Sequence, residues 1–146
     1  MKSSPKAVYD SNIYISGIFW RGTTRHLLEL ARGGKVEVSV SLPILTEIHR
    51  TITGRKFLLT QEEADQTIRD ILSYTKRTSP KRRIHAITTD PDDNKVLECA
   101  VTSNSQFVVS NDHHLTDLKK YRKIKIVRAG EFWKKFAEEK LQKQTH

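Results

Sequence analysis

The amino-acid sequence predicts an α/β fold with a central, mainly parallel β-sheet flanked by helices. Short apolar runs alternate with longer segments whose apolar residues recur at helical spacing, which is typical of a parallel sheet covered by helices. The chain has 146 residues, 36% of them hydrophobic and 29% charged, as expected of one globular domain. We therefore expect a single domain over residues 1–146, with a core at about 6–136 and a basic tail at 137–146.

In the first half of the chain, strands and helices are expected to alternate. Lys6–Tyr9 is a short apolar run followed by turn-forming residues, which indicates a buried strand. The elements expected after it are one helical turn within 13–20, a helix capped by Thr23 or Thr24 and ended at Gly33–Gly34, a strand at 36–40, and a helix started by Ser41 and Pro43. Glu47 lies at the margin of the apolar face of that last helix, so it can reach a cleft beside the sheet.

The second half repeats the alternation. Thr60 to Glu63 is a good helix start, and Asp90 can cap a central helix with Pro91 in its first position. The elements expected here are a helix at 60–74, a basic loop at 76–83, a short strand at 84–87, the central helix, a strand at 106–109, a short helix or turn at 113–121, a strand at 124–127, and a helix at 131–142 with Phe132, Trp133 and Phe136 inward.

The central helix carries two neighbouring acids that face different ways. At about 100° per residue, its apolar residues share one face, and Asp93 falls near the centre of that face. Asp92 lies about 100° away, toward solvent. Asp93 is therefore either the reciprocal half of a capping box or part of a site.

Four acids are expected to meet at one rim of the sheet. Asp10 and Asp112 each follow a predicted strand, and the carboxyl ends of parallel strands form the ligand-binding edge of such sheets. Inward-facing Asp93 and marginal Glu47 should lie at the same rim. Gathered carboxylates repel each other unless a cation compensates them, and Mg²⁺ or Mn²⁺ prefers oxygen ligands. Such ions support in-line hydrolysis of phosphodiesters.

The charge balance favours a polyanionic partner. With 26 Lys and Arg against 17 Asp and Glu, the net charge is +9 and the pI is near 9.8. A basic surface of this kind suits nucleic acid or an acidic protein, although a solvated basic face without a partner is the alternative. The candidate RNA-binding residues are Lys81, Arg82, Arg83, Arg21 and Lys95. Phe19 and Trp20, beside Arg21, either stack on bases or anchor a loop in the core.

Four ordered motifs resemble those of PIN-domain ribonucleases, above all the toxins of VapBC-type toxin–antitoxin pairs. The motifs are Val8–Asn12, Ser41–Glu47, Asp90–Lys95 and Val109–Asp112. The resemblance implies a PIN-like three-layer fold, Mg²⁺- or Mn²⁺-dependent endoribonuclease activity on RNA, a cognate antitoxin and a homodimer. Carried over by position, Asp10, Glu47, Asp93 and Asp112 match the acidic quartet of the family. Asn12 and Ser110 match the polar positions that orient it, and Ser11 stands where the family often has Thr.

Other classes of protein fit less well. The competing hypothesis is a non-catalytic basic module of the same fold that binds nucleic acid or protein. The histidines show no zinc spacing, and His113–His114 is either a solvated turn or a contact to substrate. An aspartyl-phosphate phosphatase would need a second Asp where the chain has Asn12. One cysteine, Cys99, excludes an intramolecular disulfide and suits a reducing compartment. No membrane-length apolar run or signal peptide is evident, so we expect a cytoplasmic protein.

Overall fold

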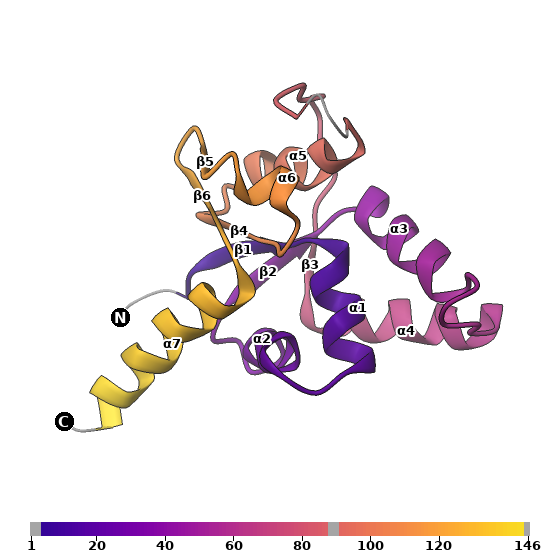
Figure 1. Cartoon of the computed structure of the whole chain (residues 1–146), viewed down its shortest axis with the longest axis horizontal. Helices are drawn as coiled ribbons and strands as arrows, with labels where there is room; N and C mark the ends of the chain where they lie inside the picture. The colour runs from indigo at the N-terminus through magenta and orange to yellow at the C-terminus, as the bar shows by residue number, and fades with distance from the viewer. Residues whose placement is uncertain (1–3, 88–90, 145–146) are drawn as a thin grey trace.

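The computed structural model describes residues 4–87 and 91–144 of the chain (Figure 1). Its strands are β1 (Lys6–Tyr9), β2 (Glu37–Val40), β3 (Lys76–Arg77), β4 (Phe107–Val109), β5 (Lys120–Tyr121) and β6 (Ile124–Val127). They form a six-stranded sheet in the order β3-β2-β1-β4-β6-β5. Every neighbouring pair is parallel except β5 with β6. The expectation of a mainly parallel α/β sheet is confirmed.

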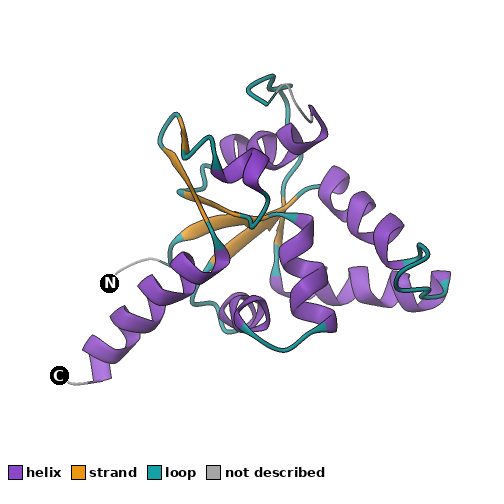
Figure 2. Cartoon of the chain, viewed as in Figure 1, coloured by secondary structure: helices purple, strands orange, loops and turns teal. Residues whose placement is uncertain are grey.

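Helices cover both faces of the sheet. They are α1 (Ser11–Phe19), α2 (Thr23–Arg32), α3 (Leu42–Ile52), α4 (Gln61–Tyr74), the 3₁₀ turn η1 (Pro91–Asp93), α5 (Asn94–Thr102), α6 (His113–Thr116) and α7 (Ala129–Gln144). In Figure 2, α5 and α6 lie on one side of the strands, and α1, α2 and α7 lie on the other. α5 contacts β1, β2 and β4, so it packs on the central strands of the sheet.

The core is centred on β1, the third strand across the sheet. Ala7, Val8 and Tyr9 are each 0% exposed because helices pack on both faces of this strand. Strands buried on both faces are continuously apolar, which explains why these short runs were recognisable in the sequence. The Tyr9 hydroxyl donates a hydrogen bond to the Leu27 carbonyl at 2.9 Å, so this buried polar atom has a partner.

Helix boundaries agree with the sequence in most places, but three helices differ from expectation. The central helix was expected to begin at Pro91, whereas residues 91–93 form the η1 turn and α5 begins at Asn94. Where one turn was expected, α1 is a nine-residue helix, since its apolar face packs into the core and tertiary burial overrides weak local signals. Thr23 and Thr24 were expected to cap α2, but Gly22 holds the cap position, and Thr24 Oγ1 donates to Ser16 Oγ at 2.9 Å. The capping box at the start of α4 is present, with the Thr60 and Glu63 side chains bonding each other's backbone N–H.

The expected strand at 84–87 is wrong, because side chains of α5 take its backbone hydrogen bonds. The Ile84 N–H donates to Glu98 Oε2 at 2.8 Å. The Ile87 N–H donates to Asn94 Oδ1 at 2.9 Å, and Asn94 Nδ2 donates to the Ile87 carbonyl at 2.8 Å. The segment is therefore a strap along α5. The sheet instead uses two-residue strands that the sequence did not indicate, β3 within the basic loop and β5 after α6.

Two further expectations concern the cap of the central helix and membrane-spanning helices. Asp90, the expected cap of the central helix, lies outside the described residues. Within residues 4–87 and 91–144, no helix combines the length and apolarity needed to cross a bilayer.

Candidate active site

The four acids predicted from the sequence come from four elements that meet at the carboxyl ends of β1 and β4. Asp10 follows β1, Glu47 lies on α3, Asp93 ends the η1 turn, and Asp112 caps α6. Three of these acids are close enough to interact electrostatically, because the charges of Glu47 and Asp112 both raise the pKa of the Asp10 carboxyl. The parallel strand ends therefore bring together residues that are far apart in the sequence.

Asp10 is the most buried of these acids, with 3% of its surface exposed. Burial raises its pKa from 3.8 to about 6. The hydrogen bond from Ser110 opposes this rise, and the neighbouring charges of Glu47 and Asp112 add to it. Ionising Asp10 thus requires a higher pH than an ordinary carboxyl needs, and a nearby cation would favour its ionised form.

Ser110 connects two of the acids from a fully buried position between β4 and α6. Its Oγ donates to Asp10 Oδ2 at 2.8 Å and accepts the Asp112 N–H at 3.0 Å. Asp112 Oδ1 in turn accepts the His114 N–H at 3.0 Å. The hydroxyl thereby holds Asp10 while fixing the backbone that carries Asp112.

Asp93, Asp112 and His114 offer donor atoms that all lie within 4.8 Å of one another. The Nδ1 atom of His114 is 3.6 Å from Asp93 Oδ2 and 3.8 Å from Asp112 Oδ1. Two carboxylates and an imidazole at this spacing can share one divalent ion. Sequence reasoning did not place His114 in the site. The available signal was its position two residues after Asp112, in the first turn of α6.

Asp93 and Asp92 differ in exposure as the helical phase predicted. The Asp93 side chain is 14% exposed, against 70% for Asp92. Asp92 is nevertheless linked to the site, because its Oδ2 lies 2.7 Å from Lys95 Nζ. The hydrogen bond from Lys95 lowers the pKa of Asp92.

Lys95 is buried between two carboxylates. Its side chain is 8% exposed, and its ammonium donates to both Glu47 and Asp92. Burial alone would lower the Lys95 pKa, but these hydrogen bonds outweigh it and the pKa is raised. Ser11 Oγ donates to the other Glu47 oxygen. Glu47 is therefore positioned by a hydroxyl and a cation, beside the cluster of Asp93, Asp112 and His114.

The remaining candidate residues lie at varying distances from the acids. Asn12 is exposed in the first turn of α1, next to Asp10. Arg21 lies beyond the other end of α1, where Trp20 packs on Phe57 with ring centroids 5.7 Å apart. Lys81, Arg82 and Arg83 are exposed along the outer face of α5.

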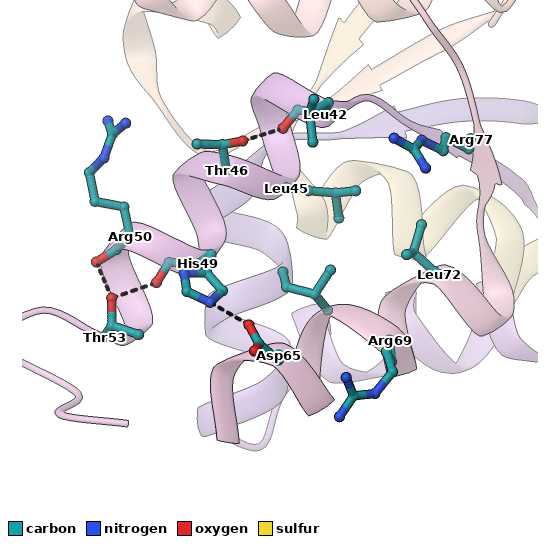
Figure 3. A pocket seen from close by; sticks show the side chains of 11 residues that line it. Leu42, Leu45, Thr46, His49, Arg50, Thr53, Asp65, Arg69, Leu72 and Arg77 are labelled. Atoms are coloured by element: carbon teal, nitrogen blue, oxygen red, sulfur yellow. Dashed lines mark hydrogen bonds and ion pairs between the residues drawn. The ribbon is translucent and has the colours of Figure 1, made fainter. Parts of the chain in front are cut away.

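A groove of about 660 Å³ lies between α3 and α4, beside the helix that carries Glu47 (Figure 3). Its apolar lining consists of Leu42, Leu45, Ile68 and Leu72, and Leu42 is 58% exposed. Arg50, Arg69 and Arg77 also line it, and its acid, Asp65, is 2.8 Å from His49 Nε2. This surface is apolar with a basic rim, and it is separate from the acidic cluster.

Comparisons with known proteins identify the family. No curated protein sequence matches the chain. Among solved structures, it is similar to a chain in the crystal structure of VapBC2 from Rickettsia felis bound to a promoter DNA fragment, with a TM-score of 0.59 and 15% identity over 84% of this chain and 98% of that chain. At this identity the likeness shows a shared fold. The family model of the PIN domain matches residues 6–114, a range that includes Asp10, Glu47, Asp93 and Asp112. The chain belongs to the PIN domain family.

Proposed function

We propose that this PIN domain is a metal-dependent endoribonuclease that hydrolyses RNA phosphodiester bonds and serves as the toxin of a toxin–antitoxin pair. The observation that carries the proposal is Asp10, a buried carboxyl whose pKa is raised to about 6 and whose neighbours include two further acids. A buried carboxyl beside two further acids contributes little to the stability of a fold, and carboxyls with raised pKa values are frequent at functional sites.

The donor set fits a hard divalent cation. Asp93, Asp112 and Asp10 supply oxygen ligands of the kind that Mg²⁺ and Mn²⁺ prefer, and His114 adds a nitrogen that Mn²⁺ tolerates. A bound ion would neutralise the carboxylates and make a water molecule more acidic for attack on phosphorus. Ser110 orients Asp10, and Ser11 with Lys95 orients Glu47 toward the same rim.

The net charge of +9 supports a nucleic-acid substrate. Lysine and arginine hold a phosphate backbone by releasing its counterions, while the acids act on one scissile bond. The alternative, a non-catalytic basic module, would bind RNA but leave it intact in the presence of Mg²⁺ or Mn²⁺.

Cleavage of a labelled single-stranded RNA tests the proposal. We expect activity with Mg²⁺ or Mn²⁺, none with EDTA, and a loss of at least about 100-fold in Asp93→Asn, because the amide removes a metal-binding charge. Asp117→Asn is the matched control, since Asp117 is an exposed acid beyond α6. RNA binding without cleavage would support the binding module, and activity in EDTA would contradict a metal mechanism.

We further infer that an antitoxin docks an acidic, amphipathic segment into the α3–α4 groove. The leucine-lined floor suits apolar side chains, and the arginines at the rim suit acidic ones (Figure 3). VapBC2 from R. felis, which contains the chain with the similar fold, was solved bound to a DNA fragment from its promoter. The homodimer expected from the family resemblance remains a prediction, which sedimentation analysis of the purified chain can check.

Co-purification with the product of the adjacent gene tests the groove. Leu42→Asp should abolish it by placing a charge on the apolar floor. Leu58→Asp is the control, because Leu58 is 73% exposed and lies outside the groove. Equal retention of the partner by both variants would contradict docking at this surface.

A further inference from the structure

A second cavity, of about 420 Å³, lies on the outer face of α5. Its walls are residues 81–85, which lead into the strap (84–87), the α5 residues Glu98, Val101 and Thr102, and Tyr121 and Arg122 at the turn between β5 and β6. None of the four acids lines it. The cavity is therefore distinct from the candidate active site and from the α3–α4 groove.

The strap connects this cavity to the acids. The backbone of Ile84 is hydrogen-bonded to the side chain of Glu98, and the backbone of Ile87 is hydrogen-bonded to the side chain of Asn94, one turn earlier on the helix. The strap thus runs antiparallel to α5, toward the end at which Asp93 lies. At 1.5 Å per residue, Glu98 is about 7.5 Å further along the helix axis than Asp93. Glu98 also lies about 140° around the helix axis from Asp93, so the cavity is displaced from the acids both along and around α5.

The cavity is strongly cationic. Lys81, Arg82, Arg83 and Arg122 line it, and all four are exposed. The lining includes one carboxylate, Glu98, which already accepts the Ile84 N–H at 2.8 Å. The excess of positive charge makes the cavity suited to an anion.

The cavity also offers an aromatic surface beside a guanidinium. Tyr121 is half-buried in the wall, and the guanidinium carbon of Arg122 is 5.5 Å from the centroid of its ring. An aromatic ring next to arginine is the combination with which proteins hold single-stranded nucleic acid, because the ring stacks on a base and the cation binds a phosphate. A free phosphate ion has no group that could stack on the ring.

Arg122 occupies a backbone conformation that favours glycine. Its φ is +53°, in the left-handed region, where an ordinary side chain costs about 1 kcal/mol. Glycine or asparagine would adopt this backbone conformation at a lower free-energy cost than arginine does. Lys119 has the same backbone conformation, with φ +61°, so what distinguishes Arg122 is its place in the lining of the cavity.

We propose that this cavity binds one nucleotide of the RNA strand whose phosphodiester bond lies at the acidic cluster. The basic side chains, Arg122 among them, hold its phosphate, and the base packs on Tyr121 and the apolar edge of α5 around Val101. The strap leads from this subsite toward the end of α5 at which the acids lie. The identity of the polymer rests on the proposed ribonuclease function.

Arg122→Gly is the decisive variant, because it removes the cation while relieving the backbone. Its matched control is Lys119→Gly: Lys119 is exposed, basic, at φ +61°, and outside the cavity. Both variants lose one positive charge and gain the same backbone freedom. We expect neither to lower the melting temperature.

The measurement is binding of a fluorescein-labelled single-stranded oligouridylate in EDTA, over a range of salt concentrations. Arg122→Gly should weaken binding about tenfold and lower the slope of log K against log salt by about 0.7, the value of one phosphate contact on a single strand. Lys119→Gly should change the affinity less than about twofold. Equal effects of the two variants would overturn the subsite.

Two further arms separate this inference from the proposed function. If Arg122→Gly weakens binding of poly-glutamate but not of RNA, the cavity is a protein-binding site and the inference is overturned. If wild type cleaves RNA with metal while both variants bind RNA alike, only the subsite fails. If wild type fails to cleave but Arg122→Gly alone loses RNA affinity, the ribonuclease fails and the subsite is supported.

Discussion

The buried acid beside β1 makes the stability of the metal-free protein depend on pH. The pKa of Asp10 is raised from 3.8 to about 6, which corresponds to about 3 kcal/mol between its protonated and ionised forms. Because the folded state holds this proton more tightly than the unfolded state, the stabilisation is fully present below about pH 3.8 and is lost as pH rises through about 6.

Asp10→Asn should remove this dependence. Asparagine keeps an oxygen that can accept the hydrogen bond from Ser110, but it cannot ionise. In EDTA, the stability of the variant relative to wild type should therefore rise by about 2.4 kcal/mol between pH 4 and pH 7. Saturating Mg²⁺ or Mn²⁺ at pH 7 should stabilise wild type and have much less effect on the variant.

Urea unfolding followed by tryptophan fluorescence at each pH measures the difference. Asp117→Asn serves as the control, because it removes an exposed carboxylate outside the acidic cluster. A difference between Asp10→Asn and wild type that stays the same from pH 4 to pH 7 would refute the reasoning from burial.

Other predictions follow from single contacts. Asp92→Asn should keep the initial rate of RNA cleavage within about tenfold of wild type, since Asp92 is 70% exposed, whereas Asp93→Asn should lower that rate at least about 100-fold. Similar initial rates for the two variants would show that the two acids share one role. Gly17→Ala should destabilise the fold by about 1–3 kcal/mol in urea, because the added Cβ would lie 2.7 Å from Leu28 Cδ1. Thr60→Ala breaks the capping box of α4 and should lower stability in the same assay by about 1 kcal/mol; no change would mean that the cap is redundant.

The sequence predicted the elements whose signal is local. β1 and β4 were recognisable because strands buried on both faces are continuously apolar. The helical phase expected for the central helix separated Asp93 from Asp92, and this difference in exposure holds although both acids lie in the η1 turn that precedes α5. The meeting of Asp10 and Asp112 followed from a general property of parallel sheets.

What the sequence missed depends on partners distant along the chain. The segment 84–87 has the residues of a strand, but Glu98 and Asn94 of α5 take its backbone groups. Lys95 resembles a surface cation, yet its burial is set by Glu47, 48 residues earlier. His114 joins Asp93 only through the fold, and no spacing rule links the two.

The hydrogen bond between Ser110 and Asp10 has a consequence for the synthesis of the protein. It joins residues 100 positions apart, and β1 cannot pair with β4 before that strand has left the ribosome. At about 5–20 residues per second, translation from residue 10 to residue 112 takes about 5 to 20 s. During this interval the nascent chain carries Asp10 and Glu47 without Ser110, Asp112 and His114. If the proposed function is correct, the ribosome that makes the chain would meet the assembled acidic cluster only after residues 110–114 have emerged, about three quarters of the way through the chain.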